Sequence, residues 1–161
     1  MEDKVELGKL EEKDVEKVLD LIMRLKKLNQ EFDSTFEVNE DSREDALKLL
    51  KGIAADRECY FAQVAKSRGK IAGIIVSEFR KRVFYKPPME ARILEIYIMP
   101  EFRRSSVGQA LVDSLYAECR KRDIDLVTAE FPSLNVIALN FYKKMGYREI
   151  VSVYGKQIRK N

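Results

Sequence analysis

Histidine is absent from this chain of 161 residues. The absence excludes catalytic triads that contain histidine, zinc sites that need an imidazole ligand, and general bases that are imidazoles. Any acid–base chemistry must therefore use carboxylates, tyrosine, lysine, cysteine or water. We expect no metal site.

Cysteine is scarce, and long apolar runs are missing. Cys59 and Cys119, the two cysteines, lie far apart within apolar patterns, so we expect buried, reduced thiols and no disulfide. No segment approaches the apolar length of a membrane span, and the N-terminal Met-Glu-Asp-Lys-Val does not resemble a signal peptide. These features lead us to expect a cytoplasmic protein without a membrane partner.

A strong charge of either sign is missing as well. Lys and Arg number 30 and Asp and Glu number 27, a net charge of +3, so no general attraction to nucleic acid is implied. The basic, aromatic residues 80–88 are either a soluble loop tip or a contact for an acidic partner. The length and the apolar fraction of 45% suit one domain over residues 1–161.

Hydrophobic periodicity predicts about seven strands and about four helices. The strands are expected over residues 5–10, 59–66, 71–79, 93–98, 124–131, 147–153 and 154–159. The helices are expected over 11–29, after the capping box Ser42-Arg-Glu-Asp45, over 107–122, and over 135–144 with Gly146 closing the last one. Because the helix over 107–122 crosses between two strands that should be parallel, the fold class is α/β, an α+β layer sandwich.

The stretch from Ile93 to Ala110 organises the chain. Residues 93–98 are a short, β-branched apolar run ended by Pro100, and apolar positions recur at helical spacing from Val107. Between them lies a basic loop of small residues, 103–108. Backbone N–H groups, the helix dipole and two arginines would converge there on an anion, for which a pyrophosphate is the natural guest.

Two patterns in this half of the chain are specific. One is Arg103-x-x-Ser106-x-Gly108-x-Ala110, and the other is Asn135-x-x-Ala138-x-x-Phe141-Tyr142-Lys-Lys-x-Gly146-Tyr147. They resemble the acyl-CoA loop and the downstream segment of the GNAT acetyltransferase superfamily. The chain departs from the family pattern at Ser106, where glycine is usual, so we expect a weakened or re-routed phosphate contact. Alternatively, Ser105 and Ser106 simply cap the following helix.

The resemblance implies a fold and a cofactor site. The GNAT fold has a mixed central sheet in which two parallel strands splay apart around the pantetheine arm of acetyl-CoA. The residues expected to bind acetyl-CoA are Ile96, Tyr97, Ile98, Arg103, Arg104, Ser105, Ser106, Val107, Gly108, Gln109, Asn135 and Tyr142. Family members are often dimers, so a homodimer is a further expectation.

The resemblance also makes Tyr142 the candidate general acid toward the departing thiolate; otherwise it is a core residue with a satisfied hydroxyl. Two carboxylates are candidates for the base that takes the amine proton. Glu130 resembles the glutamate base of GNAT enzymes that modify protein N-termini. Glu95 is an acid in an apolar strand on the face of Tyr97, and it either lines the acceptor cleft or pairs with a basic neighbour such as Arg92.

Residues 30–41 lose the helical period and place phenylalanines among acids. In the resembling family this connection often forms part of the acceptor site. That resemblance assigns Glu31, Phe32, Asp33 and Phe36 to the substrate and favours a cationic amine. The alternative is a solvated acidic loop whose two phenylalanines pack into the core.

These inferences predict an acetyl-CoA-dependent N-acetyltransferase that acts on a primary amine, either a small cationic amine or a peptide or protein amine. The competing hypothesis is a CoA-binding regulatory or interaction module of the same fold with little turnover, because Ser106 and the undecided base leave it open. The fold does not fix the acceptor.

Overall fold

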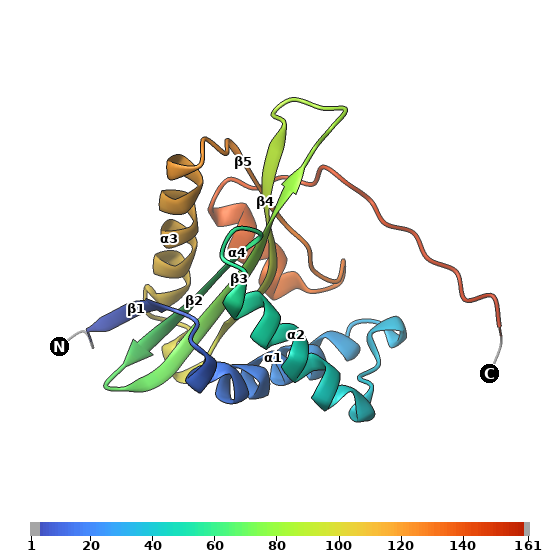
Figure 1. Cartoon of the computed structure of the whole chain (residues 1–161). Helices are drawn as coiled ribbons and strands as arrows, with labels where there is room; N and C mark the ends of the chain where they lie inside the picture. The colour runs from blue at the N-terminus through green and yellow to red at the C-terminus, as the bar shows by residue number, and fades with distance from the viewer. Residues whose placement is uncertain (1–3, 160–161) are drawn as a thin grey trace.

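The computed structural model describes residues 4–159 and contains a five-stranded sheet with helices on both faces (Figure 1). The strand order is β1-β2-β3-β4-β5, and neighbours are antiparallel except β4 and β5, which are parallel. The strands are β1 Val5–Lys9, β2 Tyr60–Ser67, β3 Lys70–Lys81, β4 Met89–Ile98 and β5 Leu126–Ala129. The helices are α1 Val15–Gln30, α2 Arg43–Ala55, α3 Val107–Lys121 and α4 Val136–Lys144.

Two hydrophobic cores lie on opposite faces of this sheet. Helix α1 buries Val18 and Ile22 in the same cluster as Ile74 of β3, whereas α3 buries Leu111 in the same cluster as Ile75. Ile74 and Ile75 belong to different cores because successive strand residues point to opposite faces. The layer architecture and the parallel β4–β5 pair joined by α3 are as the sequence predicts. Within residues 4–159, no helix has both the length and the apolar character needed to cross a membrane.

The hairpin between β2 and β3 follows from its turn residues. Arg68 and Gly69 both have positive φ, 50° and 75°, which matches the right-handed twist of the flanking strands. Gly73, further along β3, permits a close approach: a Cβ there would lie 2.8 Å from Cδ1 of Ile98. Gly73 therefore lets β3 and β4 pack closely at this point.

The sheet has five strands, so the expectation of about seven is wrong. The two missing strands are those predicted over 147–153 and 154–159, a segment in which residues 148–159 form neither helix nor strand. In Figure 1 this segment runs away from the body of the molecule as an extended coil. A β-prone sequence becomes a strand only when a neighbouring edge supplies hydrogen bonds, and this segment pairs with none in the described chain.

Two smaller expectations also fail. The capping box at Ser42 does not form: its backbone is already helical, with φ −85° and ψ −1°, and its hydroxyl donates to the carbonyl of Asn39. An extended N-cap is needed for the side chain to reach the first turn. Cys59 is exposed because it precedes β2, whereas Cys119 is buried as expected, and both thiols are free.

Candidate active site

The parallel strands β4 and β5 separate halfway along β4. Their register ends at the pair Ile93 and Ala129, and the last contact is the 3.4 Å bond from the Glu130 N–H to the Ile93 carbonyl. Beyond that point β4 pairs only with β3. Since the Met99 N–H points to β3, the backbone groups of Ile96 and Ile98 face the opening.

A β-bulge in β4 directs the side chains next to the opening. Val76 pairs with Glu95 but Ser77 pairs with Ile93, so Leu94 is an extra residue. As a result Ile96 packs with the α3 core, whereas Tyr97 belongs to the α1 core and Glu95 contacts α1. The expectation that Glu95 and Tyr97 share a face is confirmed.

The loop after β4 leaves backbone donors free at the start of α3. A short 3-10 turn, Pro100–Phe102, is followed by the turn 103–106. The first helical bond is donated by Ala110 to the Ser106 carbonyl. The N–H groups of residues 106–109 therefore have no backbone partner among the described residues, and the α3 dipole adds positive potential there.

The two arginines of this loop have different surroundings. Arg103 folds back onto β4, donates from Nε to the Ile98 carbonyl at 3.2 Å, and places its guanidinium 5.6 Å from the ring centre of Tyr97. Arg104 is exposed and makes no hydrogen bond or ion pair with a described residue. Arg104 is therefore the free cation beside the helix N-terminus, and Arg103 braces the end of β4.

The backbone of the loop explains why serine can stand at position 106, where the resembling family usually has glycine. Ser106 has φ −79° and ψ 12°, outside the left-handed region, so its backbone does not require glycine. Ser106 makes no cap bond, and the Ser105 hydroxyl donates to the Phe102 carbonyl, so the capping alternative is wrong. Gly108 permits a close approach between α3 and α4, because a Cβ there would lie 3.1 Å from the Phe141 ring.

Helix α4 opens on Asn135. Its side-chain oxygen accepts from the Ala138 N–H at 3.1 Å and caps the helix. The residue is buried, and its amide nitrogen has no hydrogen-bond partner among the described residues. That nitrogen is available to a ligand.

Tyr142, on the buried face of α4, lies in an aromatic cluster. Its ring stacks on Phe131 at 5.4 Å between centroids and meets Tyr147 at 5.1 Å. Its hydroxyl makes no hydrogen bond with another described residue. The alternative of a core residue with a satisfied hydroxyl therefore holds for the buried ring and fails for the hydroxyl. Burial raises the pKa of the phenol, and the charges of Tyr116 and Glu95 raise it further. Tyr142 is therefore a protonated donor that shares its electrostatic environment with Glu95.

Glu95 pairs with Lys26 of α1, and not with Arg92 as one alternative had it. Burial raises the pKa of the Glu95 carboxyl, and the charge and hydrogen bond of Lys26 oppose that rise. Lys26 was not among the residues predicted from the sequence. The signal was present, because Lys26 interrupts the buried stripe of α1 between Ile22 and Asn29.

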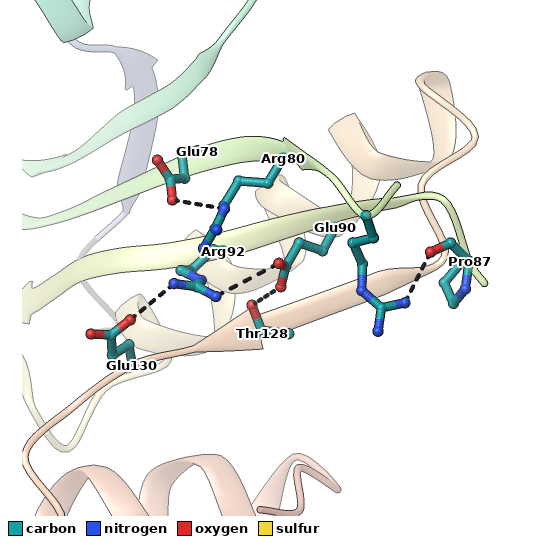
Figure 2. Close-up of polar contacts among 8 residues, drawn as sticks. Glu78, Arg80, Pro87, Glu90, Arg92, Thr128 and Glu130 are labelled. Atoms are coloured by element: carbon teal, nitrogen blue, oxygen red, sulfur yellow. Dashed lines mark hydrogen bonds and ion pairs between the residues drawn. The ribbon is translucent and has the colours of Figure 1, made fainter. Parts of the chain in front are cut away.

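Glu130 lies in a different setting, on the surface at the end of β5. Figure 2 shows Arg92 between two carboxylates: its Nη1 contacts Glu130 at 3.1 Å and its Nη2 contacts Glu90 at 3.7 Å. Glu90 also accepts a 2.7 Å bond from the Thr128 hydroxyl. The Glu130 side chain is 65% exposed, so this carboxylate is ion-paired and hydrated.

The loop between α1 and α2 keeps its aromatic residues out of the core. Phe36 is 44% exposed, Phe32 is half-buried, and neither belongs to the two core clusters, so the core-packing alternative is wrong. Glu31 is exposed. Asp33 is exposed and accepts bonds from the backbone N–H and hydroxyl of Thr35, which lower the pKa of its carboxyl.

Glu95 faces α1 and Tyr142 lies in the core on the α3 side of the sheet, and the charge of Glu95 acts on the Tyr142 phenol. Glu130 lies on the surface at the end of β5. The loop from Glu31 to Phe36 follows the C-terminal end of α1, the helix that carries Lys26.

Comparison with known proteins gives one family. Residues 25–147 match the model of the Acetyltransferase (GNAT) family. A ribosomal protein bS18-alanine N-acetyltransferase from Escherichia coli (strain K12) is 30% identical over 60 residues, 37% of this chain and 40% of that protein. This match therefore spans less than half the length of the curated relative.

Two crystal structures are similar over nearly the whole chain. A ribosomal-protein-alanine N-acetyltransferase from Brucella melitensis biovar Abortus 2308 has a TM-score of 0.72 at 15% identity, covering 97% of this chain and 100% of that one. A predicted acetyltransferase with acetyl-CoA from Clostridium acetobutylicum has a TM-score of 0.75 at 17% identity, covering 96% of this chain and 97% of that one. At these identities the likeness shows the fold.

Proposed function

Because the chain belongs to the acetyltransferase (GNAT) family, we propose that it transfers the acetyl group of acetyl-CoA to the nitrogen of a primary amine. The observation that carries the proposal is the opening between β4 and β5 beside the free N–H groups of α3. One end of the site suits a pyrophosphate and the other holds an acid and a carboxylate.

The residues present fit acetyl-CoA. The free N–H groups of residues 106–109 and the Arg104 guanidinium would hold the pyrophosphate. The outward backbone groups of Ile96 and the N–H of Ile98 would pair with the amides of the pantetheine arm, as an added strand does, while the Ile98 carbonyl accepts from Arg103. The bound thioester supplies the acetyl group and a sulfur leaving group.

We assign the base to Glu95 in preference to Glu130. Glu95 is partly buried, its pKa is raised, and its charge acts on Tyr142, whereas Glu130 is hydrated and held by Arg92. Glu95 would accept the proton of the incoming amine, directly or through water. As the carbon–nitrogen bond forms and the carbon–sulfur bond breaks, the Tyr142 phenol would donate its proton to the departing sulfur.

We propose a peptide or protein amine as the acceptor. Two similar proteins carry the name of ribosomal-protein-alanine N-acetyltransferases. In this chain the exposed Phe36 and the half-buried Phe32 would contact the first side chain of a peptide, and Glu31 would attract its ammonium group. A small cationic amine would use the same acids.

The test is release of CoA from acetyl-CoA with a panel of acceptors. We expect release with peptides that begin with alanine, and none above background with the same peptides acetylated in advance at the N-terminus. A polyamine and an aminoglycoside test the small-amine acceptor. Replacing Glu95 by Gln should lower the rate by about 10²–10⁴-fold, the usual contribution of a general base.

Calorimetric titration with acetyl-CoA separates this proposal from the competing module. Acetyl-CoA binding without amine-dependent release for any acceptor would favour a CoA-binding module. The matched control is Glu130→Gln, for which we expect a smaller loss than for Glu95→Gln. The reverse order would move the base to Glu130.

A further inference from the structure

The hairpin between β3 and β4 ends in exposed apolar side chains. The two strands stay paired up to the base of the loop, which consists of residues 82–88. At its tip the exposed fractions are 82% for Val83, 90% for Phe84 and 66% for Tyr85, and none of the three belongs to either core cluster. Figure 1 shows this loop extending beyond the other strands and the helices. The acetyltransferase proposal assigns no role to it.

Arg82 holds the loop in shape. Its backbone N–H donates to the Pro88 carbonyl at 2.7 Å, and its Nη1 donates to the Pro87 carbonyl at 2.9 Å, a bond drawn in Figure 2. The Tyr85 N–H closes a turn on the Arg82 carbonyl at 3.0 Å, and the guanidinium lies 5.3 Å from the centre of the Tyr85 ring. These contacts brace the two sides of the loop against each other, so the apolar tip between them is presented outward.

The charge of the hairpin differs from that of the whole chain. Residues 80–88 contain four basic residues and no acidic one, whereas the net charge of all 161 residues is only +3. Arg80 is paired with Glu78 at 3.6 Å. Lys81 and Lys86, which precede and follow the tip, are exposed and form no ion pair with another described residue. The hairpin thus carries free cations behind an apolar tip, which is complementary to an anionic surface with an apolar interior.

A lipid bilayer fits this arrangement better than a nucleic acid does. Proteins that bind single strands stack bases on open aromatic faces along a basic groove. Here the guanidinium of Arg82 lies over the Tyr85 ring, Phe84 pairs with no other ring among the described residues, and Val83 offers no ring at all. Lipid can surround a projecting tip on all sides and bury its aliphatic and aromatic side chains together.

We propose that the tip of the β3–β4 hairpin inserts Val83 and Phe84 into the surface of a bilayer that contains anionic phospholipids. Lys81 and Lys86 then lie at the level of the lipid phosphates, with their apolar stems along the boundary of the hydrocarbon. Tyr85 suits the same boundary, because its ring is apolar and its hydroxyl is polar.

This contact is peripheral. The expectation that the chain has no membrane partner rests on the lack of a membrane-spanning segment, and a loop that only enters the surface does not need one. Binding of this kind gains from the buried apolar area and from the attraction between basic side chains and anionic lipids. Removing either contribution should therefore weaken it, and the two can be removed separately.

Tryptophan fluorescence tests the insertion in the full chain. The chain contains no tryptophan, so a single introduced one reports only on its own surroundings. In Phe84→Trp, vesicles of phosphatidylcholine and phosphatidylserine should shift the emission to shorter wavelength, and lipids brominated along the acyl chain should quench it. Leu49→Trp is the matched control, because Leu49 is 61% exposed on α2, away from the hairpin, and its emission should not change.

Vesicle flotation measures how strongly each variant partitions. Phe84→Ser should weaken partition about tenfold or more, the value of burying one large apolar side chain. Lys81→Glu with Lys86→Glu should weaken it about thirtyfold or more, because two attractions to anionic lipid are lost. Lys17→Glu with Lys27→Glu is the control with the same change in net charge, placed on exposed positions of α1, and it should lose much less.

Circular dichroism shows that each variant is folded, and acetyl-CoA titration should give the same affinity for all of them, since no proposed cofactor residue lies in the hairpin. Vesicle binding without quenching of the Phe84→Trp emission would overturn the insertion, as would equal partition of the native chain and Phe84→Ser. A native chain that binds single-stranded RNA but does not partition to the vesicles would replace lipid by nucleic acid. None of these outcomes depends on the acetyltransferase proposal.

Discussion

At the scale of single residues, burial raises the pKa of the candidate base Glu95 and Lys26 opposes that rise. Its ammonium favours the ionised form of Glu95, while burial favours the protonated form. In Lys26→Met the pKa of Glu95 should therefore rise, and the acid limb of the kcat/KM profile should move to higher pH. The measurement is kcat/KM from pH 5.5 to 9 with a peptide acceptor.

Lys27→Met is the matched control, because Lys27 is exposed on the same helix and has no contact with Glu95. It should leave the profile unchanged. An acid limb that stays in place in Lys26→Met would show that the base is not Glu95.

Variants of the neighbouring tyrosines Tyr142 and Tyr147 distinguish an effect on catalysis from an effect on stability. The Tyr142 hydroxyl has no described hydrogen-bond partner, so Tyr142→Phe should leave the thermal midpoint nearly unchanged while lowering kcat by about 10²-fold or more. Tyr147→Phe loses the bond to Tyr116 and should cost about 0.5–1.5 kcal/mol of stability with kcat retained. Thermal unfolding and kcat are measured on both variants, and equal kcat values would remove Tyr142 from catalysis.

At the scale of elements, Gly108 governs how closely α3 and α4 approach. A Cβ at this position would meet the Phe141 ring at 3.1 Å, so the ring, which lies on α4 next to Tyr142, would have to shift by a few tenths of an ångström. Gly108→Ala should therefore cost about 1–3 kcal/mol and reduce turnover. Gly52→Ala in α2 is the control, because a Cβ there has nothing within 4 Å, and it should stabilise by about 0.5–1 kcal/mol. Chemical denaturation measures both, and a neutral Gly108→Ala would contradict the packing role.

The sequence predicts an element well when local residues determine it and poorly when pairing with a distant segment determines it. The helices and the β2–β3 hairpin follow from local periodicity and turn residues, so their positions are predicted within a few residues. The strands expected over 147–159 are not formed, because pairing depends on an edge that the segment itself does not encode.

The site shows the same division. The loop 103–108 and the Asn135 cap were predictable because their chemistry is contiguous in sequence. The bulge at Leu94 and the Lys26–Glu95 pair were not, since each depends on two segments that meet only in the fold. Arg103 turning back to Ile98 is a similar case, because nothing in the motif distinguishes it from Arg104.

At the scale of the whole molecule, the sheet connects two helical layers that each contribute to the opening. Layer α1–α2 supplies Lys26, and layer α3–α4 supplies Tyr142 and the anion-binding N-terminus. A ligand lying across this opening binds only the folded chain, so it should stabilise the whole molecule. At 100 times its Kd the gain is about 2.7 kcal/mol, which corresponds to a rise in the thermal midpoint of roughly 5–10 °C for a chain of this size.

Differential scanning calorimetry with acetyl-CoA measures this rise in the thermal midpoint. Variants of the two loop arginines should change it in different ways. Arg104→Ala removes the free cation beside the α3 N-terminus and should weaken binding about tenfold or more, the value of a charge-assisted hydrogen bond. The rise at a fixed acetyl-CoA concentration then shrinks, while the midpoint without ligand is unchanged because Arg104 has no described partner. Arg103→Ala should instead lower the midpoint without ligand, because it frees the Ile98 carbonyl. Equal ligand-induced rises in the native chain and in Arg104→Ala would place the anion elsewhere than at this loop.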